Sequence, residues 1–158
     1  MLTVVREGGG VATQRTSHGE FFALHDLTHL VVESQLGFGD AFFGLLGKGW
    51  DFGAFTDKAD PRYAALPREA LVAEHIVGVI SRRALEVARS DPELRDVWCE
   101  EVAAEIAASL SGAGLVLPAA LGERLVGIAS RLEQLMTAWR ALPPGEHLEL
   151  HFPDGPGA

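Results

Sequence analysis

The sequence predicts an α+β fold that is mainly α: a helical bundle of about four to five helices with one small antiparallel sheet. The middle of the chain repeats apolar residues at spacings of three and four, which is the pattern of an amphipathic helix. Short β-branched or alternating stretches lie at the two ends. With 158 residues, 47% of them hydrophobic and 22% charged, the chain is expected to form a single domain, 1–158.

The N-terminal element is expected to be a β-hairpin. Residues 2–6 and 11–15 carry β-branched side chains on either side of three consecutive glycines, which suit a tight turn. At the other end, residues 146–152 alternate polar and apolar side chains, as a strand with one wet face does. Because an isolated hairpin is marginal in water, we expect the C-terminal strand to pair with it. The tail 153–158 is expected to be frayed.

Helical patterns fill the chain between these ends. Each is bounded by Gly, Pro or Asp at positions that suit helix ends, and the ranges are 23–36, 39–48, 68–90, 92–111 and 118–142. The stretch 37–66 interleaves glycines with aromatic residues. Glycine allows backbone segments to approach closely, so these rings form either the wall of a pocket or the cap of a small core.

Charge and composition restrict the possible partners. The net charge of −9, with a pI near 5.0, opposes binding to nucleic acid or to anionic lipid. No apolar run approaches the roughly 20 residues that a membrane-spanning helix needs, and the N-terminus lacks the pattern of a secretory signal. We therefore expect a cytoplasmic protein with no nucleic-acid or membrane partner. The single cysteine, Cys99, excludes a cysteine-rich zinc module, so any metal must use histidine and carboxylate ligands.

The most informative feature is a row of polar residues on the first expected helix. His25, His29 and Glu33 follow one another at spacings of four residues, so they lie along one face, opposite the leucines of the same segment. Two imidazoles four residues apart can share a divalent metal, and zinc is favoured by this ligand type. Glu33 lies about 12 Å along the helix axis from His25 at 1.5 Å per residue, so it does not easily join both histidines on one ion.

A second polar pair interrupts an apolar run of the expected helix 68–90. Glu74 and His75 stand between Ala73 and Ile76, and charged groups are rare in such a run unless they are paired or bound. Either residue could complete a three-ligand set with the two histidines of the first helix if the two helices pack together.

The site hypothesis that follows has named roles. The metal ligands are His25, His29 and His75, and zinc is the favoured divalent metal. The catalytic candidates are Asp26, as a proton acceptor or a partner that orients a ligand, and Glu33. This set predicts a metal-binding helical protein with the potential of a hydrolase.

The segment His25-Asp26-Leu27-Thr28-His29 is similar to the HExxH helix of zinc metalloproteases, in which two histidines bind zinc and the glutamate acts as the base. The resemblance implies that His25 and His29 are zinc ligands and that Asp26 takes the place of the base. Asp26 is one methylene shorter than that glutamate, which shortens its reach. The downstream third ligand of the family has no recognisable counterpart in this chain.

The same helix with Val32-Glu33, the Gly/Phe stretch, and the closing segment Trp139…Leu142-Pro143-Pro144-Gly145…Leu148-Glu149-Leu150 resembles a small family of uncharacterised bacterial proteins. This resemblance spans most of the chain. It implies that the polar residues of the helix belong together, and it brings no activity with it.

A second interpretation stays open at this point. The polar row could be the solvated face of a surface helix, with His29 and Glu33 forming a pair worth a few tenths of a kcal/mol. The chain would then be a non-catalytic ligand-binding protein, or a homodimer that associates through the Phe/Gly segment and an apolar helical face. The sequence names neither a substrate nor a small-molecule ligand, and it does not decide whether the protein is an enzyme.

Overall fold

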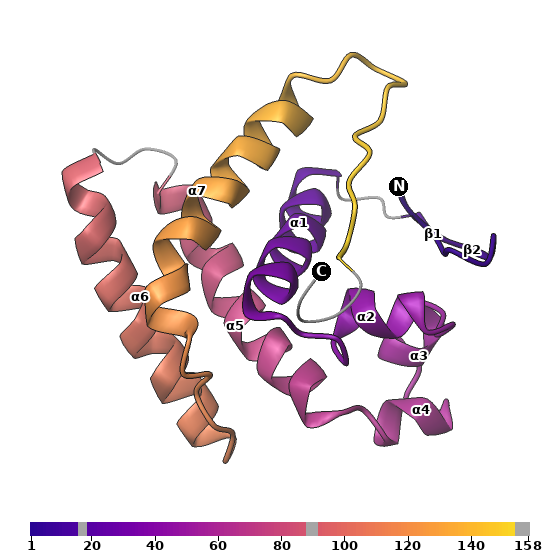
Figure 1. Ribbon diagram of the computed structural model, residues 1–158, viewed down its shortest axis with the longest axis horizontal. Coiled ribbons are helices and arrows are strands. Elements are labelled where there is room, and N and C mark those ends of the chain that lie inside the picture. The colour runs from indigo at the N-terminus through magenta and orange to yellow at the C-terminus, as the bar shows by residue number, and fades with distance from the viewer. Residues whose placement is uncertain (16–18, 88–91, 154–158) are drawn as a thin grey trace.

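The computed structural model describes residues 1–15, 19–87 and 92–153, and the expected tail from 154 onward lies outside them. Its framework is a bundle of long helices, as Figure 1 shows: α1 (Gly19–Leu36), α5 (Arg68–Val87), α6 (Pro92–Gly112) and α7 (Leu121–Arg140). Helix α1 packs against α5 and α7, and α6 packs against the same two helices from the outside. The prediction of a mainly α fold with a small antiparallel sheet is confirmed.

The core of the bundle consists of the apolar stripes of these helices. On α7, the buried residues recur at spacings of three and four, as the sequence predicted: Leu121, Leu125, Ile128, Leu132 and Leu135. On α5, Ile76, Val77 and Ile80 are fully buried between α1 and α6. None of the helices in the described ranges is long and apolar enough to cross a membrane.

Three short helices follow α1 and lie together beside the bundle: α2 (Phe42–Gly47), α3 (Gly53–Thr56) and α4 (Pro61–Ala64). The first of them corresponds to the expected helix 39–48, whereas α3 and α4 lie in the stretch that the sequence left without a helix. A glycine fixes where the chain turns from α1 towards them. Gly37 has a φ of 69°, and the N–H of Phe38 donates to the carbonyl of Glu33 at 2.8 Å, which closes the helix with a Schellman motif.

The N-terminal hairpin forms as expected. Strands β1 (Leu2–Val5) and β2 (Val11–Gln14) pair antiparallel, with Val5 opposite Val11. Gly9 has a φ of 80° in the turn. The side chain of Arg6 attaches the hairpin to the short helices, because its Nε donates to the carbonyl of Leu46 at 2.7 Å and its Nη2 to that of Trp50 at 2.6 Å.

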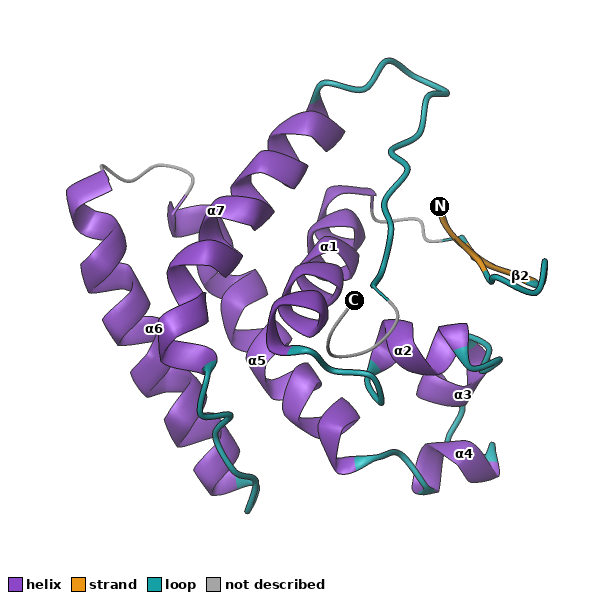
Figure 2. Cartoon of the chain, in the orientation of Figure 1, coloured by secondary structure: helices purple, strands orange, loops and turns teal. Residues whose placement is uncertain are grey.

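The expected C-terminal strand is the part of the fold prediction that was wrong. In the described part of the chain the sheet contains β1 and β2 alone, and residues 146–152 form no strand (Figure 2). The alternation of this segment has another cause. Leu148 and Leu150 pack against the helical core, while the intervening polar residues face solvent. Phe152 stacks on Phe43 with ring centroids 5.7 Å apart, so the segment lies across α2 rather than along the hairpin.

The close packing of α2 explains why position 44 in the Gly/Phe stretch is a glycine, and it gives a first testable prediction. A Cβ on Gly44 would collide with the carbonyl oxygen of Gly39 and lie 2.6 Å from its carbonyl carbon, whereas a Cβ on Gly47 in the same helix meets nothing within 4 Å. Gly44→Ala is therefore expected to lower the free energy of unfolding by about 2 kcal/mol, the usual cost of overpacking.

Urea denaturation with Gly47→Ala as the matched control tests this expectation. Gly47→Ala should leave stability unchanged or raise it by about 0.5–1 kcal/mol, because alanine favours the helix more than glycine does. Equal stability of the two variants would contradict the close approach of Gly44 to Gly39.

Candidate metal centre

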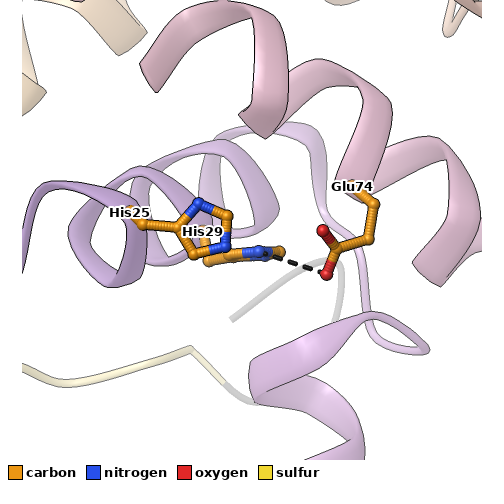
Figure 3. A group of neighbouring side chains, drawn as sticks. All are labelled: His25, His29 and Glu74. Atoms are coloured by element: carbon orange, nitrogen blue, oxygen red, sulfur yellow. Dashed lines mark ion pairs between the residues drawn. The ribbon is translucent and has the colours of Figure 1, made fainter. Parts of the chain in front are cut away.

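Helices α1 and α5 bring three possible metal ligands together. His25 and His29 lie one turn apart on α1, and Glu74 reaches towards them from α5, as Figure 3 shows. One ligand atom from each of the three residues lies within 4.8 Å of the others. The Nε2 atom of His29 is 3.4 Å from Oε1 of Glu74, and the two imidazole rings meet edge to face with centroids 4.8 Å apart. The side chains therefore already converge on one point.

Glu33 orients His29 through the ring nitrogen that points away from Glu74. Its side chain is fully buried, and its Oε1 accepts a hydrogen bond from Nδ1 of His29 at 2.9 Å. The same carboxylate accepts the backbone N–H groups of Phe42 at 3.1 Å and Phe43 at 2.9 Å, at the start of α2. A carboxylate that holds one ring nitrogen of a histidine leaves the other nitrogen free for a metal. Glu33 thus fixes the ring orientation in which Nε2 of His29 faces Glu74.

The burial of this row rules out the interpretation that it is a solvated face. His29 is 2% exposed and Glu33 is 0% exposed. The polar side of α1 is covered by α2, whose Phe42 ring lies 5.0 Å from the His29 ring, centroid to centroid. Phe42 in turn contacts Phe55, with centroids 4.9 Å apart. The aromatic residues of the Gly/Phe stretch therefore form a wall beside the histidines.

Electrostatics make His29 a cation when no metal is bound. Burial disfavours the charged ring, but its hydrogen bonds to Glu33 and Glu74 and the charges of the two carboxylates outweigh burial and raise the pKa of His29 to about 9. Burial also raises the pKa of Glu33, against the opposing effect of its hydrogen bond from His29. For Glu74, burial acts to raise the pKa, but the hydrogen bond from His29 and the nearby positive charges lower it overall. The imidazolium is held between two carboxylates.

The two other residues of the row have shifted pKa values as well. Burial, followed by repulsion from the charge of His29, lowers the pKa of His25, so its ring is neutral and able to bind a metal near pH 7. Burial raises the pKa of Asp26 to about 6, although His29 and the N-terminal amine act in the opposite direction. A carboxyl group with such a pKa exchanges protons close to neutral pH, as a general base must.

The structure brings together some of the residues that the sequence predicted for the site, and it places others elsewhere. His25 and His29 belong to the cluster, and Glu74 supplies the third ligand atom. His75 lies outside this group, since its Nδ1 shares a hydrogen bond with Oγ of Ser109 on α6 at 2.8 Å. The polar pair at 74–75, which interrupts an apolar run, was the feature of the sequence that predicted a site residue on α5. Of these two residues, Glu74 is the one whose position on the helix faces α1. Glu33 contacts His29 and α2 and is not one of the three converging groups.

None of the family models, curated proteins and solved structures with which the chain was compared matches it. The resemblances of the His25–His29 segment and of the longer pattern thus remain predictions, and the function has to be argued from the geometry.

The donor set fits a divalent transition metal. Two imidazole nitrogens and one carboxylate oxygen form the ligand set of catalytic zinc sites that keep a further position for water or substrate. The arrangement also has the outer partner that metal-bound histidines usually require, the carboxylate of Glu33 on Nδ1 of His29.

Proposed function

We propose that this protein binds one divalent metal ion, zinc by preference, through His25, His29 and Glu74. The observation that carries the proposal is the convergence of these three side chains within 4.8 Å, with His29 oriented by the buried carboxylate of Glu33. A purely structural imidazole–carboxylate pair needs no second histidine and no second carboxylate on the opposite ring nitrogen. The lone thiol of Cys99 suits the cytoplasm, where cysteines stay reduced, and we propose that location.

We further propose that the bound metal serves hydrolysis. A zinc ion with an open position activates water and polarises a carbonyl or phosphoryl oxygen. Asp26 is the proton acceptor that we propose, because its carboxyl group is half-buried and lies close enough to His29 to interact with the charge of that residue. The aromatic wall at Phe42 excludes water from one side of His29.

The metal content of untagged protein tests the proposal. We expect about one zinc per chain by plasma mass spectrometry, and no zinc in the double variant His25→Ala/His29→Ala, whose fold is checked by circular dichroism. The half-exposed Glu74 offers a gentler test. Glu74→Gln should lower the zinc affinity by about 100-fold, since even the outer partners of metal sites are worth about 10- to 100-fold.

The matched control is Glu100→Gln, at an exposed position on α6. It removes the same charge from the protein and should leave the zinc affinity unchanged. The metal centre would be refuted if the purified wild type contained no metal and bound no zinc in a titration. If Glu74→Gln and Glu100→Gln lowered the zinc affinity equally, the decrease would come from the change in net charge alone.

A further inference from the structure

A groove begins beside the candidate metal centre and runs between α5 and α6. It has a volume of about 340 Å³, which is at the lower end of the range for small-molecule sites. One helix face of α5 and one residue of α6 line it: Glu74, His75, Gly78, Val79, Arg82 and Ser109. Glu74 belongs both to this lining and to the metal ligands, so the groove and the centre adjoin.

Of the three possible metal ligands, Glu74 is the most exposed, and it is the one that lines this groove. His29 is 2% exposed and the ring of Phe42 covers it, whereas the side chain of Glu74 is 54% exposed. A ligand that enters a free coordination position therefore approaches past Glu74, and the rest of the molecule then lies along α5.

The far end of the groove carries hydrogen-bond donors and a positive charge. Arg82 is 65% exposed, and its Nη2 donates to Oε1 of Glu105 at 2.8 Å. A guanidinium has five N–H donors, so Arg82 keeps capacity for a second anion. At the other end, next to Glu74, His75 uses Nδ1 for its hydrogen bond with Ser109, and its other ring nitrogen has no hydrogen-bond partner among the described residues. These groups suit carboxylate or phosphoryl oxygens.

We propose that the groove binds a small organic anion whose charged end lies at Arg82 and whose other end reaches the metal centre. This inference rests on the proposed metal site and adds the class of its substrate. Glu74 and Arg82 are eight residues apart on one helix, which corresponds to about 12 Å along the axis. A molecule that contacts both ends therefore has an organic chain between its two polar groups, and an inorganic ion is too short.

Gly78 leaves room for this chain. It lies between the two ends of the groove, and a Cβ added to it would meet nothing within 4 Å. A larger side chain at this position is therefore expected to extend into the groove, so that Gly78→Leu tests whether the groove is occupied. Gly122→Leu is its control, because Gly122 also lies on a helix, with open space around its Cβ, but on α7.

The experiment compares two zinc-binding probes on the zinc-loaded protein by isothermal titration calorimetry. Octanohydroxamate and suberic monohydroxamate have the same chain length and differ in the terminal group, which is a methyl in the first and a carboxylate in the second. We expect the carboxylate probe to bind about fivefold more tightly, a modest gain because Arg82 is exposed and Glu105 competes for it. Arg82→Gln should abolish this preference, and Arg131→Gln on α7 should keep it. Gly78→Leu should weaken both probes about tenfold, a loss of about 1.4 kcal/mol.

Zinc affinity is measured separately for every variant, which distinguishes the two proposals. If all variants bind zinc alike and the two probes bind the wild type equally, the anion groove is wrong and the metal centre stands. The groove is equally refuted if Gly78→Leu behaves like Gly122→Leu. If the wild type binds no zinc, the proposed function fails, and the inference fails with it.

Discussion

Replacing Glu33 with alanine is expected to lower the free energy of unfolding of the metal-free protein by about 3–5 kcal/mol, as breaking a buried charge pair does. The variant leaves His29 without its carboxylate partner and leaves the N–H groups of Phe42 and Phe43 unsatisfied in the dry interior. Such a loss is a large part of the total stability of a domain, typically about 5–15 kcal/mol. Urea denaturation in the presence of a chelator measures it.

Glu74→Ala is the matched control, because it removes the other carboxylate that contacts His29. The side chain of Glu74 is 54% exposed, so water replaces the lost contact with His29. The free energy of unfolding should therefore change by less than about 1 kcal/mol. Glu33→Gln should fall between the two, since the amide keeps one oxygen acceptor and places an NH₂ group against a backbone donor. A loss of stability that is equal for Glu33→Ala and Glu74→Ala would mean that Glu33 is not the buried anchor of α2.

The metal-free protein is also expected to become less stable as the pH rises from about 6.5 to about 9. The folded pKa of His29 is raised to about 9 from its ordinary 6.5, so the folded state holds a proton that the unfolded state has lost. The stabilisation is complete below pH 6.5 and disappears as the pH passes through 9. At roughly 1.4 kcal/mol per pKa unit, it amounts to about 3 kcal/mol at most.

The other groups that face His29 titrate outside this window or act in the same direction. Asp26 has a pKa of about 6, and the lowered pKa values of His25 and Glu74 place their effects at lower pH. The raised pKa of Glu33 also favours the folded state at lower pH. The measurement is urea denaturation at a series of pH values with a chelator present.

The decisive variant is His29→Gln, which should remove most of the slope between pH 6.5 and 9 because it removes the proton that the folded state retains. His147→Gln, at an exposed position of the C-terminal segment, should keep the slope. The interpretation of His29 as a buried imidazolium is wrong if its replacement leaves the pH dependence unchanged.

Local patterns predicted the four long helices and α2, but not the four-residue helices α3 and α4, because helical periodicity and end signals need more than one turn of neighbouring residues. The apolar stripe of α7 and the turn at Gly37 are examples. The strand expected at 146–152 shows the limit of the same reasoning. An alternating pattern reports which side chains are buried, but it does not say whether they are buried against a sheet or against helices.

The sequence by itself determined that His25, His29 and Glu33 share one face of a helix, because a repeat of four residues is a property of the helix alone. Tertiary structure decided what that face does. The packing of α5 on α1 placed Glu74 beside the two histidines and turned His75 towards Ser109 on α6. The packing of α2 against Glu33 buried the polar row of α1, which by its sequence could equally have faced water. Both outcomes depend on contacts between residues far apart in the chain, which no local pattern encodes.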